Sequence, residues 1–453
     1  MTEPQSGSEA GNDIDLLQDL IGRARRAGAD AADAVMFEGV SLSHARRLGK
    51  TEKLERSEHR DLGLRVFVGR QQAIVSSSDR SAKALAELVE RALGMARAVP
   101  EDPFCGLAEP GDIAHDWPEL DMLDPEEPPA ETLIERAAAA EEAALAVPGV
   151  TNSEGAEAGW GRSRVALAAS NGFAGAYAGS HQGVSVSVLG GSGTGMERDY
   201  DYTSAIHAAD LRDPAEIGRN AGERAVKRLG ARKMPTGKFP VVFDSRVARG
   251  FISHLLGAIN GPSIARGTSF LKDRLGQRVF PEGITIIDDP HRRRGLRSKP
   301  FDGEGIANRR RALIEKGVLT TWLLDLRSAR QLGLKTTGHA ARGTASPPSP
   351  ASTNVWIEPG LLSPAELMAD IASGLYVTEL MGMGVNGVTG DYSRGAAGFW
   401  IENGEIAFPV SEMTVAGNLK DMFARLVAAN DLEFKTGADA PTLRIDDLTV
   451  AGA

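Results

Sequence analysis

The spacing of apolar residues changes repeatedly along the first hundred positions of the chain. Leucines and an isoleucine within residues 13–27 recur at the spacing of one helix face, and Gly28 follows them as a stop signal. Between residues 33 and 78 the period changes, and residues 34–37, 62–68 and 72–76 have patterns typical of strands, with charged residues between them. Residues 80–97 return to helical spacing. The pattern therefore predicts two helices that flank a group of antiparallel strands.

A stretch rich in proline and acidic residues, 99–130, interrupts this regularity and predicts a long connection over the surface. An alanine-rich helix is expected at 130–147, strands over 150–210 and another helix at 213–229. The glycine-rich run at 190–195 suggests a phosphate-cradling loop, but the segment after it has the pattern of a strand. A flexible hairpin loop is the better interpretation of this run.

Short strand patterns dominate the second half of the chain. A strand at 236–243 precedes an amphipathic helix at Ser245–Ala258, and a further helix is expected near 364–374. Asn403 and Gly404 separate two apolar runs, and both residues accept positive φ, so they predict a tight type I′ hairpin turn.

These patterns place the chain in the α+β class, with an N-terminal domain of helices and antiparallel sheet followed by a β-rich C-terminal domain. Its 453 residues exceed the size of one hydrophobic core, so several units are expected. The expected divisions are a disordered leader at 1–12, an N-terminal subdomain at 13–98, the connection at 99–130, a middle region at 131–235 and the C-terminal domain at 236–453.

Net charge and cysteine content limit the kinds of partner and the cellular location that we expect. The formal net charge of −10 argues against binding to nucleic acid, because neutralising phosphates requires a positive field. Cys105 is the single cysteine, so a disulfide within the chain is excluded and a cytoplasmic location is expected. The first residues lack the apolar core of a secretory signal. No run of about 18 apolar residues predicts a membrane span.

The histidines and acidic residues show no recognisable catalytic spacing. None of the eight histidines has a second histidine within a helical turn, as a zinc helix requires. His254 lies alone on the amphipathic helix, where a locally bonded structural role is more common. Basic runs at 291–294 and 309–311 suit either an anionic partner or a solvated face. For the acidic residues there are three alternatives: acid–base catalysis, cation binding or simple solvation. These residues are Asp288, Asp289, Asp302, Glu304 and Asp391.

Two long segments resemble a known family. They are LRSKPFDGEGIANRRRALIEKGVLTTWLLDLRSARQLGLKTTGHAARG at 296–343 and GDYSRGAAGFWIENGEIAFPVSEMTVAGNLKDM at 390–422. Both resemble the PmbA/TldE branch of the TldD/PmbA family, and the resemblance extends from about residue 14 to the C-terminus. It implies a cytosolic metallopeptidase of two subunits, in which a TldD-like partner binds zinc through His-Glu-x-x-x-His and a cysteine and supplies the general base.

The resemblance also implies that this chain is the subunit without the metal site. His254 falls at the first histidine of the motif, Leu255 at the glutamate and Ile259 at the second histidine. No cysteine follows Leu432. We therefore expect no catalytic residue, no metal ligand set and no cofactor in this chain, with zinc in the partner subunit.

In this hypothesis the chain forms one wall of the shared chamber. Its β-rich C-terminal domain holds unfolded or extended peptide by strand addition. Glycines permit close backbone approach and polar side chains orient the peptide, although turn geometry alone is the alternative explanation. The residues expected to contact the peptide are Gly390, Asp391, Ser393, Arg394, Gly395 and Gly398.

Two other functions are open alternatives. The first is a regulatory protein-binding module without hydrolysis, such as a modulator of a topoisomerase or of a toxin–antitoxin system, a label that family members have carried. The second is a self-sufficient enzyme whose unusual metal site uses His254 and carboxylates. Pairing of the chain with itself is a further open alternative.

Overall fold

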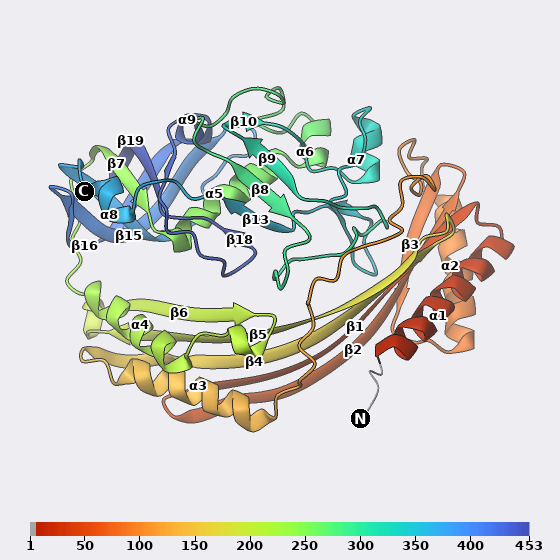
Figure 1. The fold of residues 1–453 in the computed structure, drawn as a ribbon, viewed down its shortest axis with the longest axis horizontal. Helices are drawn as coiled ribbons and strands as arrows, with labels where there is room; N and C mark the ends of the chain where they lie inside the picture. Colours follow the sequence, from red (N-terminus) through yellow and green to blue (C-terminus); the bar gives the residue numbers. More distant parts are fainter. Residues whose placement is uncertain (1–5, 453) are drawn as a thin grey trace.

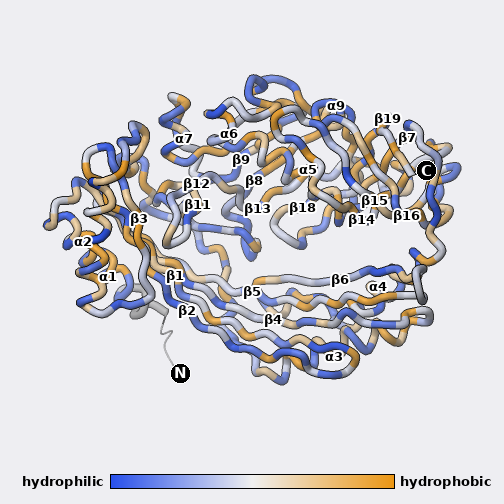
Figure 2. Tube along the Cα trace, turned by 180° about the vertical axis from the view of Figure 1, so that it is seen from behind, coloured by the Kyte–Doolittle hydropathy of each residue, from blue (hydrophilic) through white to orange (hydrophobic). Residues whose placement is uncertain are grey.

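The computed structural model describes residues 6–452 and confirms the α+β class. Figure 1 shows two lobes: a long curved sheet with helices on its outer side, and a compact lobe of C-terminal residues that lies over the other side. Figure 2, from behind, shows the same arrangement, with the first two helices at one end of the curved sheet. None of the described helices is long and apolar enough to cross a membrane.

The N-terminal lobe is built on one antiparallel sheet in the order β3-β2-β1-β4-β5-β6. Two strands are longer than expected, because residues 50–60 pair with β1 although their side chains are exposed. Alternation of apolar and polar residues marks only strands with one buried face. A strand that is exposed on both faces therefore gives no periodic signal in the sequence. The strands are β1 (Ala31–Arg47), β2 (Lys50–Val68), β3 (Gln71–Ser77), β4 (Val150–Ala169), β5 (Ala174–Gly190) and β6 (Glu197–Ala205).

Four helices cover this sheet, close to the positions that the sequence predicts. The first pair packs mainly on β1, β2, β3 and β4 and the second pair on β1, β4, β5 and β6, each pair around its own apolar core. The helices are α1 (Ser6–Arg26), α2 (Ala82–Ala98), α3 (Ala130–Leu145) and α4 (Pro214–Lys227). Residues 6–12 of the expected leader are thus helical, and residues 1–5 lie outside the described residues.

The C-terminal lobe contains a sheet in the order β16-β15-β14-β7-β19-β17, in which β16 also pairs with β19. This extra pairing closes the sheet into a ring. Its strands are β7 (Gly237–Phe243), β14 (Ser373–Met381), β15 (Asp391–Glu402), β16 (Glu405–Asn418), β17 (Val427–Ala428) and β19 (Leu443–Ala451). The helix α5 (Ser245–Ala258) has the expected bounds and packs against the core of this lobe.

A second sheet of this lobe has the order β10-β9-β8-β13-β18. Its strands are β8 (Ile286–Asp289), β9 (Arg311–Glu315), β10 (Val318–Leu319), β13 (Asn354–Ile357) and β18 (Ala438–Asp439), and a separate pair is formed by β11 (Ala340–Ala341) and β12 (Ser349–Pro350). The short helices are α6 (Gly261–Ala265), α7 (Leu326–Gln331), α8 (Pro364–Met368) and α9 (Leu419–Ala424), with one-turn helices η1 (Gly193–Gly195) and η2 (Ala208–Asp210).

Turns were predictable from the sequence where the backbone requires positive φ. Asn403 has φ of 50° and Gly404 has φ of 84°, and they join β15 to β16, so the predicted tight turn with two positive φ values is confirmed. The glycine-rich run 190–195 joins two antiparallel strands, as expected. The helix expected near 364–374 ends at Met368, because the chain enters β14 at Ser373.

The connection over residues 99–130 is not confined to the surface. Ile113 and Ala114 are buried, and Ile113 forms a β-bridge with Ile306 of the C-terminal lobe. They share one apolar cluster with Phe173 and Phe301, which come from the two lobes. The expected surface course is therefore wrong for this part, because its apolar residues fill the junction between the lobes.

A buried charge cluster crosses the same junction. Arg65 Nε lies 2.8 Å from Asp33 Oδ2, and Arg342 Nη1 of the C-terminal lobe lies 2.5 Å from Asp33 Oδ1. Burial by itself raises the pKa of Asp33, but the two guanidinium groups outweigh it and hold this pKa below its usual value. The lobes are thus tied by both apolar and ionic contacts.

Candidate functional site

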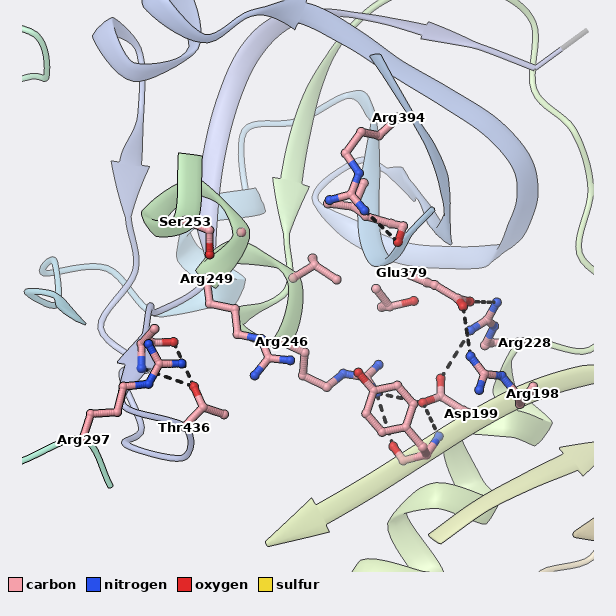
Figure 3. A pocket seen from close by; sticks show the side chains of 16 residues that line it. Arg198, Asp199, Arg228, Arg246, Arg249, Ser253, Arg297, Glu379, Arg394 and Thr436 are labelled. Atoms are coloured by element: carbon pink, nitrogen blue, oxygen red, sulfur yellow. Dashed lines mark hydrogen bonds and ion pairs between the residues drawn. The ribbon is translucent and has the colours of Figure 1, made fainter. Parts of the chain in front are cut away.

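The two lobes enclose a cavity of about 590 Å³ where β6, α5, β14 and β15 meet (Figure 3). A space of this size is typical of ligand-binding pockets. Charged side chains dominate its lining: Arg198, Arg228, Arg246, Arg249, Arg297 and Arg394, with Asp199 and Glu379.

Helix α5 forms one wall of this cavity because its polar and apolar residues fall on opposite faces. Asp244 caps the helix, and its Oδ1 accepts a hydrogen bond from the backbone N–H of Arg246 at 2.9 Å. Arg246, Arg249 and Ser253 are three and four residues apart, so they share the face that lines the cavity. On the other face, Ile252 is fully buried in the core.

Both carboxylates of the lining already have arginine partners. Arg246 Nη1 lies 2.7 Å from Asp199 Oδ1. Arg228 Nη2 lies 2.6 Å from Glu379 Oε2, and Arg198 Nη2 lies 3.5 Å from Glu379 Oε1. These pairs join β6 and the end of α4 to α5 and β14, so they hold the two lobes around the cavity.

Three arginines of the lining have no carboxylate within ion-pair distance among residues 6–452. Arg249 Nη1 donates to the Tyr202 hydroxyl at 3.4 Å, and Arg394 Nη2 donates to the Leu380 carbonyl at 3.2 Å. Arg394 Nε is buried and has no hydrogen-bond partner. Arg297, which also lines the cavity, is exposed. The cavity therefore carries positive charge that the described residues do not neutralise.

His254 stands next to this cavity in an aromatic setting. Its ring packs edge-on against Phe251 and Tyr392, with ring centroids 6.4 and 5.8 Å away. Burial, and then the nearby Arg394 guanidinium, lower the pKa of His254 to about 4, so the imidazole is neutral at neutral pH.

The residues around His254 do not fit a zinc ion. Leu255 and Ile259, at the positions that the resemblance gives to the lost glutamate and second histidine, are fully buried in the apolar core. Within the part of the chain that the structure describes, no group of three or more histidine, cysteine, aspartate or glutamate side chains is placed to hold a metal. No chemical step is derived through a metal in this chain.

The expected peptide contacts on β15 fall into separate places, because successive side chains of a strand point to opposite faces. Arg394 lines the cavity beside α5, whereas Asp391 and Ser393 line another pocket, together with residues 383–387. Hydrogen bonds from Thr389 Oγ1 and then from Asn418 hold the pKa of Asp391 below its usual value. Asp391 is thus engaged by Thr389 in its own turn and by Asn418, its cross-strand partner on β16.

The three glycines of this segment are not among the lining residues of either pocket. Gly390 has φ of +88°, and a Cβ at that position would lie 2.9 Å from Asn418 Oδ1. A Cβ at Gly398 would lie 1.9 Å from the Tyr376 carbonyl oxygen, next to the bulge in β14. At Gly395 the nearest atom would be 3.4 Å away. At Gly390 and Gly398, the atoms that approach the glycine backbone closely therefore belong to this chain itself.

Sequence reasoning did not find the arginine cluster. The spacing of Arg246 and Arg249 on the polar face of a predicted helix was a visible signal for one wall. Arg198 and Arg228 belong to the other lobe, and only the packing of the lobes brings them to the same cavity. No local pattern identifies such a set.

Two more cavities follow the first along β6. One of about 620 Å³ is lined by residues 202–204, and one of about 240 Å³ by residues 204–206. Thr436 of the C-terminal lobe lines all three cavities. The three neighbouring hollows, which we call the trough, lie between the N-terminal sheet and the C-terminal lobe, and the 620 Å³ cavity is also lined by β1, β4 and β5.

Strand β6 presents a free edge to its surroundings. It is the last strand of its sheet and pairs with β5 alone among the described strands. The Tyr200 N–H donates to Asp199 Oδ1 at 2.8 Å, and its carbonyl accepts from Arg246 Nη1 at 3.4 Å, so this backbone points away from β5. The alternation of an antiparallel ladder gives Tyr202 and Ser204 the same direction.

Comparison with known proteins decides the family. Models of three successive domains of the PmbA/TldA metallopeptidases match residues 32–96, 123–229 and 236–452. This chain belongs to the PmbA/TldD metallopeptidase family. It is 40% identical to Metalloprotease PmbA of Escherichia coli O157:H7 over 427 residues, which cover 94% of this chain and 93% of that relative. It is 38% identical to a PmbA homologue of Haemophilus influenzae, over 95% and 94% of the two chains. The PmbA/TldE branch is thereby supported.

Solved structures share the PmbA/TldD fold. A Bacteroides thetaiotaomicron protein, described as a candidate modulator of DNA gyrase, superposes with a TM-score of 0.91 at 28% identity, covering 98% of this chain and 99% of that one. TldE from Thermococcus kodakarensis superposes with a TM-score of 0.87 at 20% identity, covering 96% and 100%. At 20% identity the second likeness concerns the fold alone.

Proposed function

We propose that this member of the PmbA/TldD family is the non-catalytic subunit of a cytoplasmic zinc metallopeptidase. A TldD-like partner supplies zinc and the general base, and this chain holds the unfolded peptide in the shared chamber. The main support is the character of the cavity beside α5. Arginines line it, and within residues 6–452 His254 belongs to no group of three or more side chains that could hold a metal.

Peptide holding is supported by the free edge of β6. An extended peptide adds to such an edge through main-chain hydrogen bonds, which read the backbone and tolerate many side chains. The C-terminal sheet, where we expected strand addition, is closed by the pairing of β16 with β19. The trough beside β6 is therefore the better position for the peptide in this proposal.

A reconstitution assay tests the subunit role. Cleavage of an unfolded peptide is measured for this chain, for a TldD-like chain and for their mixture, each before and after dialysis against a chelator. The expected result is cleavage that requires the mixture, with zinc bound by the TldD-like chain alone. Chelator-sensitive cleavage by this chain alone, with stoichiometric zinc, contradicts the proposal.

A second candidate function is regulation by protein binding without hydrolysis. It is favoured by the description of the Bacteroides thetaiotaomicron structure as a candidate modulator of DNA gyrase. The same reconstitution separates the two functions. A mixture that cleaves no unfolded peptide, while this chain forms a stable complex with purified gyrase, supports the regulatory function instead.

A further inference from the structure

The cavity beside α5 has an excess of positive charge on one side. Asp199 and Glu379 already pair with the arginines at 198, 228 and 246. Arg249, Arg297 and Arg394 line the same space without a carboxylate partner within residues 6–452. The whole chain carries a formal charge of −10, so this concentration of arginine is local.

Two of these side chains approach the cavity from different elements. Figure 3 shows Arg249 on α5 and Arg394 on β15, on either side of the space. Both are half-buried, and the buried Nε of Arg394 has no acceptor. The neighbouring His254 is neutral at neutral pH, so the positive charge on this side of the cavity comes from the arginines. A guanidinium group presents paired N–H donors whose geometry matches a carboxylate.

We propose that this cavity binds a carboxylate group of the extended peptide, with Arg249 and Arg394 as its principal donors. The inference rests on the proposed function, because it names the chemical group by which the peptide is held. A peptide that follows β6 reaches this cavity where residues 198–200 form its wall. The carboxylate comes either from the C-terminus of the peptide or from an aspartate or glutamate side chain.

Fluorescence anisotropy with labelled peptides tests this site on the full chain and on the complex with the TldD-like partner. Three hexapeptides of otherwise equal sequence carry a free C-terminal carboxylate, a C-terminal amide, or the amide with one internal glutamate. We expect the free acid or the glutamate peptide to bind about tenfold more tightly than the amide, the size expected for a charged hydrogen bond. Which of the two is preferred identifies the source of the carboxylate.

Variants then connect this preference to the two arginines. Arg249→Gln and Arg394→Gln are each expected to remove most of the preference, and Arg394→Lys to restore part of it by keeping the charge. Arg266→Gln changes an exposed arginine outside the cavity lining and should retain the full preference. Thermal unfolding verifies that each variant is folded, so that a lost preference reports on the site.

Two outcomes overturn the inference. One is equal binding of all three peptides, or no binding of any, by the chain and by the complex. The other is an unchanged preference in both glutamine variants. If the mixture of the two subunits still cleaves peptide, both outcomes leave the proposed subunit role intact. A mixture that cleaves no peptide contradicts the proposed function, whichever of the labelled peptides binds.

Discussion

Arg246 and Asp199 form an ion pair across the two lobes, with Nη1 of the arginine 2.7 Å from Oδ1 of the aspartate. The side chains are 12% and 4% exposed, so the pair is almost removed from solvent. Arg246 comes from the first turn of α5 and Asp199 from β6. Burial by itself lowers the pKa of Arg246, but Asp199 outweighs it and raises this pKa above its usual value.

The first prediction concerns this pair. Arg246→Gln should lower the free energy of unfolding by about 3 kcal/mol, because it leaves a buried carboxylate with a weaker set of partners. Urea unfolding followed by tryptophan fluorescence measures the change. Arg293→Gln is the control, since Arg293 pairs with Asp121 while 76% exposed, and it should cost about 0.5 kcal/mol or less. Equal effects of the two variants would contradict the assigned role of the buried pair.

The second prediction concerns the pH dependence of stability at Glu304. Burial raises the pKa of this carboxyl, and the neighbouring Asp302 raises it further. The unfolded value is about 4.3, so the folded state retains the proton to higher pH. Glu304 therefore favours folding at low pH, and this contribution is lost as the pH rises through the raised pKa of the folded state.

Glu304→Gln should remove this loss. The amide keeps an oxygen for the Leu326 N–H, which Glu304 Oε2 accepts at 2.8 Å, and it carries no charge at any pH. We expect the variant to gain about 1 kcal/mol or more over the wild type at pH 9 relative to pH 5. Chemical unfolding at both pH values measures this difference. The control is Glu87→Gln, an exposed site on α2 that should show no such gain.

The third prediction separates two glycines of β15. Gly398→Ala should destabilise the chain by about 1–3 kcal/mol, since the added Cβ meets the Tyr376 carbonyl oxygen at 1.9 Å. Gly395→Ala adds the same atom where its nearest neighbour is 3.4 Å away, and should change stability by about 0.5 kcal/mol or less. Thermal unfolding of both variants checks the contrast. A larger loss at Gly395 than at Gly398 would show that the packing of this strand has been misassigned.

The fourth prediction compares two kinds of backbone N–H group on β6, those that point away from β5 and those that point toward it. Ser204→Pro removes an N–H that points away from β5, so the fold should persist while peptide binding weakens about fivefold, the value of one hydrogen bond. Thr203→Pro removes an N–H that points toward β5, and should lower the melting temperature because the ladder loses a bond. Circular dichroism melts and peptide anisotropy measure the two effects. Unchanged peptide binding by folded Ser204→Pro contradicts strand addition at this edge.

Local rules predicted much of the fold. The bounds of α5 and the turn at Asn403 and Gly404 follow from amphipathic spacing and from the need for positive φ. Residues 50–60 escaped prediction as a strand because both of their faces are exposed. The buried course of Ile113 was missed because tertiary contact with the other lobe, rather than local composition, places it there.

The candidate site was less accessible to sequence reasoning. Arg394 was expected at a peptide site, and the structure places it in the wall of the cavity beside α5. Its partners in that wall are contributed by segments from residue 198 to residue 438, which share no local pattern. Charge complementarity between Arg246 and Asp199 exists only after the lobes meet. A strand pattern alone also does not tell an edge strand such as β6 from a central one.

The ring of the C-terminal lobe sets an order of events during synthesis. Strand β19 lies between β7 and β16, yet its residues 443–451 are translated some two hundred positions after those of β7. Until they leave the ribosome, β7 and β16 each lack a neighbour, and the nascent lobe exposes two unpaired ladders. Nascent chains of this protein are therefore vulnerable to mispairing until residues 443–451 have emerged and paired, and protection by chaperones matters most during that interval.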